Sequence, residues 1–462
     1  MRPHRYLTVV ICCSSMFIVI CLQPLRADEA KDESQIPADQ VAAELAELGK
    51  EYYRLRDIKI QTLESAGEDA GDGAKLSDAT ISDEEWLMRE REIEAMAIDP
   101  DVEMLPRLLD FAKRHPDSPY AFDALFFVVY RGGPQTANVH GKPWQLKEEA
   151  LDVVWASHAH DPRMFILLKH LAGSLPSQKT EAFLRRALQQ GRDKNLQAAA
   201  AYSLARYYQT FVRAHQQLQR IKKKEHLLNF ERYWKIVVIP YLEKKFPFNE
   251  EALSAETDRL LDLIGDEYAD VPASHWKLSG PNRMFIGLAP FSKPKTYGDM
   301  AVAMSFELNN IIPGKLAPEI DGTDADSKRF RLSDYRGKVV LLTFTANWCV
   351  PCVAPHRLQC KLVEKYRDRP FVMLSVSRDE KIDTLKAATA SGEITWRCWW
   401  DGMYGPISKA WNGQHGIPRF ILLDDSHVIQ DFTLKHFSTQ EEFEQAIDAL
   451  LKNTPSSKSS SP

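Results

Sequence analysis

Cysteine is scarce over most of this chain. The 462 residues include seven cysteines, which are Cys12, Cys13, Cys21, Cys349, Cys352, Cys360 and Cys398. The first three belong to an apolar N-terminal segment, and the other four fall within the last third of the sequence. A disulfide framework would spread its cysteines through a small, loop-rich fold. The distribution therefore excludes such a framework and favours a single local redox device.

A large excess of charge of either sign is also missing. The chain has 59 Lys and Arg against 64 Asp and Glu, which gives a formal net charge of -5. This balance provides no electrostatic reason to expect a nucleic-acid partner. Hydrophobic residues at 44% and charged residues at 27% are typical of ordinary globular protein. Because a single hydrophobic core stops growing well below this length, we expect two or three domains.

A positively charged N-terminus precedes a long apolar run. Arg2 and Arg5 stand before residues 7–22, which are almost entirely apolar, and the chain turns acidic directly after Ala27. This order of a basic, an apolar and a small-residue region is that of a secretory signal peptide. We predict a signal peptide over residues 1–27 and an exported protein of the periplasm or cell envelope.

Two alternatives exist for the same segment. Residues 7–22 form an apolar run of marginal length for a bilayer core of about 30 Å, so an uncleaved membrane anchor is the first alternative. Membrane contact is expected only in that case, and both interpretations export the rest of the chain. A lipoprotein is the second alternative, because Cys21 ends the run, although Ile20 stands where a lipid-attachment box has a small residue.

Strand-like alternation is nearly absent from residues 41–270. Apolar side chains there recur at helical spacing, as in Leu105, Leu108, Leu109 and Ala112. Residues 110–125 resemble the turn of tetratricopeptide-like repeats, although no strict repeat length is kept. We predict an all-α array of helical hairpins, which either docks partners or buries its aromatic side chains simply as core.

Three segments have no clear apolar period. Residues 28–40 are predicted to be a disordered linker, residues 271–312 a linker with a short helix, and residues 453–462 a disordered tail rich in Ser, Lys and Pro. The remaining residues, 313–452, form the C-terminal domain.

Buried-strand runs mark that domain. They cover residues 339–344, 371–376 and 419–423. A helix between the first two runs gives a βαβ unit, so we predict an α/β domain.

The pair Cys349 and Cys352 stands where the first strand ends and the helix begins. A helix N-terminus favours a thiolate, and a Cys-x-x-Cys pair at such a place lowers the pKa of its first cysteine. Three positions are about one helical turn, which returns the second sulfur to within disulfide reach. We therefore predict Cys349 as nucleophile and Cys352 as resolving thiol, with Pro351 stiffening the turn.

A zinc site is the main competing interpretation of this pair. A structural zinc ion needs four ligands, usually from a second pair of cysteines. Cys360 and Cys398 are isolated in the sequence, and His356 is the only imidazole nearby. We predict no metal and no cofactor, and we interpret Cys360 and Cys398 as buried thiols rather than redox partners.

Three sequence motifs in order carry a family resemblance. They are GKLAPEI at residues 314–320, LSDYRGKVVL at residues 332–341 and WCVPC at residues 348–352. This third of the chain, residues 313–452, resembles the redoxin-like domain of the TlpA/ResA-like thiol-disulfide oxidoreductases of the thioredoxin superfamily. The resemblance implies a thioredoxin-like fold and electron exchange with protein disulfides, with a membrane or envelope protein as electron donor.

The resemblance also implies further site residues. In that family a cis-proline lies opposite the active cysteines, and the residue before it offers backbone bonds to the substrate. Ile417 and Pro418 match this position, although an ordinary trans proline is the alternative. Trp348 and Pro351 would complete the substrate-binding surface, and Cys349 and Cys352 would form the redox disulfide.

Departures from the family pattern affect proton transfer. Thr343 stands where thioredoxin has a buried carboxylate, and Val350 stands where some relatives have Glu, so no acidic proton acceptor is evident nearby. Water or His356 would then accept the proton, unless His356 only caps the helix or lies on the surface. Arg357 replaces a usual proline and Pro355 stands two positions earlier, which predicts a shifted helix kink.

These patterns predict an exported thiol-disulfide oxidoreductase with a partner-docking helical region. A scaffold or binding protein with an accessory thioredoxin-like domain is the alternative. A thiol peroxidase is a minor alternative, because the Pro-x-x-x-Thr-x-x-Cys motif of peroxiredoxins is absent around Cys349.

Overall fold

The computed structural model describes most of the chain in several stretches. These are residues 38–69, 98–132, 142–223, 249–273, 296–403, 405–412, 417–431 and 440–452, with isolated positions between 82 and 92 and between 235 and 240. The predicted signal peptide and C-terminal tail lie outside the described residues. The chain divides into two compact units, residues 1–266 and 267–462. No helix of the described residues is long and apolar enough to cross a membrane.

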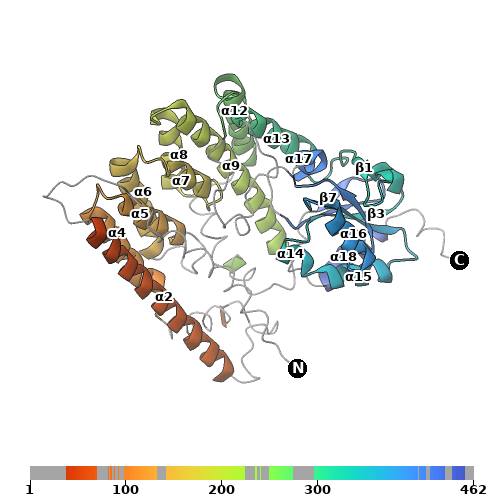
Figure 1. The fold of residues 1–462 in the computed structure, drawn as a ribbon, viewed down its shortest axis with the longest axis horizontal. Helices are drawn as coiled ribbons and strands as arrows, with labels where there is room; N and C mark the ends of the chain where they lie inside the picture. The colour runs from red at the N-terminus through yellow and green to blue at the C-terminus, as the bar shows by residue number, and fades with distance from the viewer. Residues whose placement is uncertain are drawn as a thin grey trace. The chain divides into compact units, whose positions relative to one another are not determined.

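Every regular element that the structure describes in the first unit is a helix. Its helices are α2 (Ala38–Asp69), α4 (Pro100–Arg114), α5 (Pro119–Arg131), α6 (Lys142–His158), α7 (Met164–Leu171), α8 (Gln178–Gln190), α9 (Lys194–Lys223) and α12 (Glu250–Glu267), which ends at the boundary. Successive helices pack together, as α4 with α5, α5 with α6 and α8 with α9 (Figure 1). The predicted helical region is confirmed, and its likeness to tetratricopeptide repeats stays a prediction. Because α2 begins at Ala38, the prediction that residues 38–40 belong to a disordered linker is wrong.

Local capping and an ion pair define the start of this unit. Asp99 caps α4 by accepting from the Asp101 N–H, and Pro100 occupies the first turn, where a missing N–H costs nothing. Asp101 is buried and accepts from Arg131 of α5 at 2.7 Å and from the Tyr52 hydroxyl of α2 at 2.8 Å. One carboxylate therefore joins three helices.

A second buried charge in this unit lacks such a partner. Lys147 of α6 is 0% exposed, and its Nζ lies 5.2 Å from the ring centroid of Trp144. That Nζ makes no hydrogen bond in the described part of the chain. Burial lowers the pKa of Lys147 to about 8, and it lowers the pKa of the neighbouring His170 to about 3.

The second unit is built on a five-stranded sheet in the order β5-β4-β3-β6-β7. Its strands are β3 (Val339–Thr345), β4 (Phe371–Ser377), β5 (Arg397–Trp400), β6 (Arg419–Leu423) and β7 (Ile429–Asp431), and a separate hairpin pairs β1 (Asp321–Thr323) with β2 (Arg329–Arg331). The helices are α13 (Tyr297–Asn310), α14 (Val350–Val353), α15 (His356–Lys365), α16 (Ile382–Ala390), α17 (Pro406–Asn412) and α18 (Gln440–Leu451). The three predicted strands and the helix within the predicted linker are all present, and the α/β prediction is confirmed.

The directions of the strands bring the loops at the ends of β3, β4 and β6 to one edge of the sheet. β3 and β4 run parallel in unbroken register, and β6 pairs antiparallel on the other side of β3. The C-terminal ends of β3 and β4 and the N-terminal end of β6 therefore meet at the same edge. Loops that follow or precede these ends lie beside one another.

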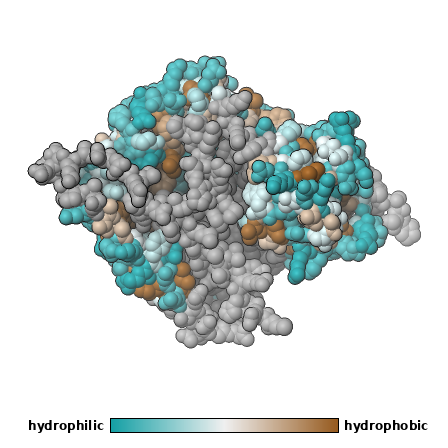
Figure 2. Space-filling view, viewed as in Figure 1, coloured by the Kyte–Doolittle hydropathy of each residue, from teal (hydrophilic) through white to brown (hydrophobic). Residues whose placement is uncertain are grey.

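Both faces of the sheet are covered. Val339 and Leu341 of β3 join a core with α15, α16 and α18, whereas the alternate residues, such as Val340, pack on the other face with Trp399 and Trp411. Trp399 stacks on Phe330 of β2 with ring centroids 4.2 Å apart. On the face drawn in Figure 2, hydrophilic residues cover most of the described surface.

Candidate active site

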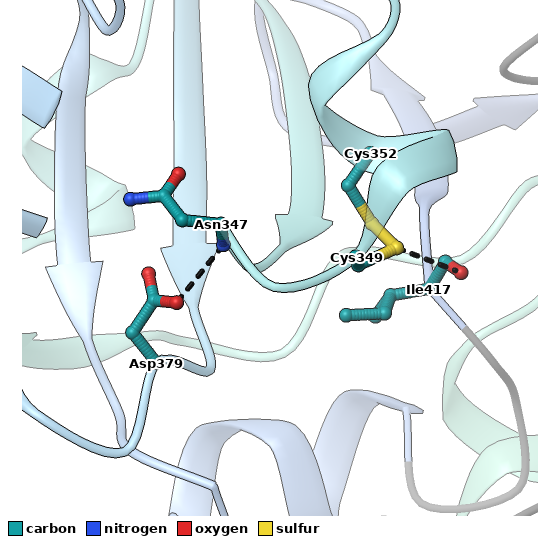
Figure 3. Close-up of a disulfide and its surroundings, with 5 residues drawn as sticks. All are labelled: Asn347, Cys349, Cys352, Asp379 and Ile417. Carbon is teal, nitrogen blue, oxygen red and sulfur yellow. Dashed lines mark hydrogen bonds between the residues drawn. A yellow bond between two sulfur atoms is a disulfide. The ribbon is translucent and has the colours of Figure 1, made fainter. Parts of the chain in front are cut away.

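The cysteine pair lies directly beyond the central strand. Cys349 caps the one-turn helix α14, and its carbonyl accepts from the N–H groups of Cys352 at 2.8 Å and Val353 at 3.1 Å. Cys349 and Cys352 are joined by a disulfide with their Cα atoms 5.2 Å apart (Figure 3). Pro351 occupies the first turn of α14, where no intrahelical N–H bond is lost.

The helix is interrupted one turn after the pair. α14 ends at Val353, and Pro355 caps a second helix, α15, that begins at His356. This position agrees with the predicted shift of the kink from Arg357 to Pro355. Since α14 has only four residues, a long helix dipole does not act on Cys349, and the N–H groups of Cys352 and Val353 bond to the Cys349 carbonyl rather than to its sulfur.

The two sulfurs are buried between exposed apolar side chains. Cys349 is 5% exposed and Cys352 is 1% exposed. On either side of Cys349, Trp348 is 39% exposed and Val350 is 73% exposed. The disulfide thus lies just below an apolar rim, with Cys349 nearer to solvent.

The segment before β6 faces the disulfide, as the family resemblance implies. The Ile417–Pro418 peptide bond is cis. The Ile417 carbonyl oxygen lies 3.7 Å from Cys349 Sγ, and the Ile417 side chain packs against Cys349, Cys352 and Ala346 (Figure 3). The structure therefore brings Ile417 and Pro418 next to the cysteine pair.

A buried carboxylate does lie near the active-site loop, and the expectation that none does is wrong. Asp379 follows β4, and its Oδ1 accepts from the Asn347 N–H at 2.9 Å, two residues before Cys349 (Figure 3). Its Oδ2 accepts from the Ser377 hydroxyl at 2.8 Å. Burial raises the pKa of Asp379 above its usual range, whereas the hydrogen bond from Ser377 opposes that rise. The sequence did contain a signal for Asp379, because it follows the buried strand β4. A strand parallel to β3 must end at the same edge of the sheet as β3.

The proposed proton acceptor His356 is buried, so a surface position is wrong. Its Nδ1 lies 3.1 Å from Glu393 Oε1, and its ring packs edge-on against Trp396. Its Nε2 makes no hydrogen bond in the described part of the chain. His356 is thus a buried member of the site's surroundings, and Glu393 is a residue that sequence reasoning missed.

The two remaining cysteines are free thiols in different environments. Cys398 in β5 is buried, and burial raises its pKa to about 12. Cys360 is only partly buried, and its Sγ lies 3.6 Å from the Glu393 carbonyl oxygen. The prediction of a buried thiol is therefore correct for Cys398 and wrong for Cys360. The described residues contain no cluster of His, Cys, Asp and Glu suited to hold a metal.

Known proteins resemble the second unit. A family model described as Redoxin matches residues 312–450. The thiol-disulfide oxidoreductase ResA of Bacillus thuringiensis subsp. konkukian is 31% identical over 143 residues, which cover 31% of this chain and 79% of that protein. The thioredoxin-like protein YneN of Bacillus subtilis is 27% identical over 172 residues, which cover 36% of this chain and 92% of that protein. Among solved structures, the thioredoxin domain of a thiol-disulfide oxidoreductase from Bacteroides vulgatus is 23% identical, covers 29% of this chain and 98% of that chain, and has a TM-score of 0.27.

Proposed function

Because this chain belongs to the ResA-like thiol-disulfide oxidoreductases, we propose that it is exported and exchanges electrons with protein disulfides through Cys349 and Cys352. The observation that carries the proposal is the disulfide at the start of α14, with the Ile417 carbonyl 3.7 Å from Cys349 Sγ. A nucleophile and an acceptor for substrate backbone are thereby adjacent.

The reaction begins with the Cys349 thiolate of the reduced protein. It attacks one sulfur of the substrate disulfide, and the other substrate sulfur leaves and takes up a proton. Cys352 then loses its proton and attacks the Cys349 sulfur, which releases the second substrate sulfur as a thiol. The substrate gains two electrons and two protons, and the Cys349–Cys352 disulfide remains. Cys349 acts first because it is the more exposed of the two residues.

Deprotonation of Cys352 occurs in a buried place and needs an acceptor. His356 begins the helix after Cys352, and the bond to Glu393 leaves its Nε2 available for a proton. Water carries the proton between the sulfur and this imidazole, and Asp379 holds the loop before Cys349 in place through Asn347.

Substrates and electron supply follow from the location. Residues 1–27 support export, where disulfides of envelope proteins such as apocytochromes or metallochaperones are available. Each turnover leaves the enzyme oxidised, so a membrane or envelope electron donor restores its dithiol. Residues 41–270 dock partners, and deleting them should abolish partner capture while turnover on a generic disulfide persists.

Reduction of insulin disulfides tests the proposal. Wild-type protein supplied with a reductant should turn over, Cys349→Ser should not, and the control Cys360→Ser should match wild type. Equal activity of Cys349→Ser and wild type would identify the domain as an adaptor without dithiol chemistry. Peroxide consumption that exceeds disulfide reduction would favour the thiol peroxidase alternative instead.

A further inference from the structure

Helix α13 precedes residues 312–450, which match the Redoxin family, yet it is part of the redox unit and packs on α17. A capping box formed by Thr296 and Asp299 starts the helix, and its buried face is otherwise apolar. The residues of that face are Tyr297, Met300, Ala301, Met304 and Glu307. Glu307 is the charged exception in this row and is 2% exposed. A carboxylate in such a place requires a cationic or hydrogen-bonding partner.

Arg419 provides that partner. Its Nη2 lies 3.2 Å from Glu307 Oε1, and its Nη1 donates to the Trp411 carbonyl of α17 at 2.7 Å. The Arg419 side chain is 12% exposed and the Glu307 side chain 3% exposed, so water screens the attraction between their charges little. α13 and α17 lie side by side in Figure 1 and pack together. The planar guanidinium thereby fastens two helices to the first residue of β6.

The backbone position of Arg419 is the important part of this contact. It directly follows the cis bond between Ile417 and Pro418, and it pairs with Phe344 of β3. Proline fixes one backbone dihedral, so the direction of the Ile417 carbonyl depends closely on where Arg419 is held. That carbonyl lies 3.7 Å from Cys349 Sγ. Two peptide units therefore separate the buried ion pair from the redox site.

We propose that Glu307 is a positioning residue for substrate binding, which through Arg419 aims the backbone of Ile417 at the polypeptide that flanks the substrate disulfide. The inference rests on the proposed function, because it concerns substrate recognition at that same site. Glu307 touches neither sulfur, so the chemistry of Cys349 itself should not depend on it. Loss of Glu307 should therefore weaken the reaction with a disulfide that has a peptide backbone. It should not affect the reaction with a small disulfide that has none.

The test compares insulin with 2-hydroxyethyl disulfide as substrates of the full-length protein. Glu307→Gln keeps a weaker acceptor for Arg419, and Glu307→Ala removes it. With insulin, we expect KM to rise by about tenfold for Glu307→Ala, as small misplacements of binding groups do, and by less for Glu307→Gln. With 2-hydroxyethyl disulfide, both variants should match wild type, and the reduction potential of the Cys349–Cys352 pair should be unchanged. If Glu307→Ala does not fold, Glu307→Gln carries the test.

Glu444→Gln is the matched control. It makes the same chemical change in an ion pair with Lys365 at 2.7 Å, on α18 of the same unit. It should behave as wild type with both substrates. Equal slowing of both substrates by Glu307→Gln, or none with insulin, would overturn the inference while the proposed function stands. Wild-type protein that reduces neither substrate would overturn both.

Discussion

The two units of this protein bury their polar groups for different purposes. In the helical unit, Asp101 and Arg131 join helices, and Lys147 lies against an aromatic ring, while residues 28–266 contain no cysteine. In the redox unit, buried polar groups gather around one edge of a sheet, where Cys349 and Asp379 lie on neighbouring loops. The first pattern serves packing, and the second builds a site.

The largest expected effect tests the chemistry of the redox unit. Cys352→Ser should leave Cys349 able to attack but unable to resolve, so turnover should fall by on the order of 10³-fold or more. Mass spectrometry of the variant with a peptide disulfide should show a mixed disulfide at Cys349. Cys398→Ser serves as the control and should accumulate none, because Cys352 still resolves the mixed disulfide and the buried Cys398 thiol, whose pKa is raised, takes no part in the reaction. Turnover retained by Cys352→Ser would contradict the two-thiol mechanism.

The next effect tests the helical unit. Arg131→Met leaves Asp101 buried without its cation, so the free energy of unfolding should fall by about 3–5 kcal/mol. Urea denaturation followed by circular dichroism measures this loss. Arg54→Met, which removes an exposed pair with Glu51, should leave the free energy of unfolding at the wild-type value. Insulin turnover by Arg131→Met should stay at the wild-type level. A loss of turnover in proportion to the loss of stability would contradict the idea that this ion pair serves packing alone.

The buried lysine predicts a pH dependence of stability. Its pKa is about 8 in the folded protein against a usual value of 10.5, so between these values the unfolded chain binds more protons and stability rises with pH. Below pH 8 the full penalty of burying the charge applies. Lys147→Met should therefore raise the free energy of unfolding at pH 7 by on the order of 2 kcal/mol.

That advantage should shrink between pH 8 and 10.5. The difference between wild type and Lys147→Met, measured by urea denaturation across this range, removes the contribution of other titrating groups. A difference that stays constant with pH would show that Lys147 does not titrate in this window.

The smallest effect concerns Asp379. Asp379→Asn keeps an oxygen that accepts from the Asn347 N–H, whereas Asp379→Ala removes it, so kcat/KM for insulin should fall about tenfold in the Ala variant and only slightly in the Asn variant. Asp424 also binds backbone N–H groups after a strand of the same sheet, and Asp424→Asn is the control. Equal losses in both Asp379 variants would show that its charge matters rather than its hydrogen bond.

The features of the redox unit that could be predicted from the sequence are those that a local residue pattern marks. β3, β4 and β6 are continuous apolar runs, and the Cys-x-x-Cys pair is a local motif. The short strands β1, β2, β5 and β7 were missed because three or four residues carry no measurable period. Trp399 lies on the short edge strand β5, and its buried ring stacks on Phe330 in the core.

Long-range contacts explain the missed site residues. Asp379 is thirty positions from Cys349, and only the parallel register of β3 and β4 brings its loop to Asn347. Glu307 and Arg419 are still farther apart in sequence, and each alone is an ordinary charged residue. The signal peptide, the disordered tail and the tetratricopeptide-like arrangement stay predictions.

The apolar rim around the disulfide has a consequence for how reactivity develops. Trp348 and Val350 are exposed, while Cys349 between them is nearly covered. A polypeptide that settles on this rim expels the water above Cys349, and the local dielectric constant falls at the moment of attack. The docked substrate thus completes the exclusion of water from Cys349, and a thiolate that loses its hydration at that moment is the more reactive nucleophile.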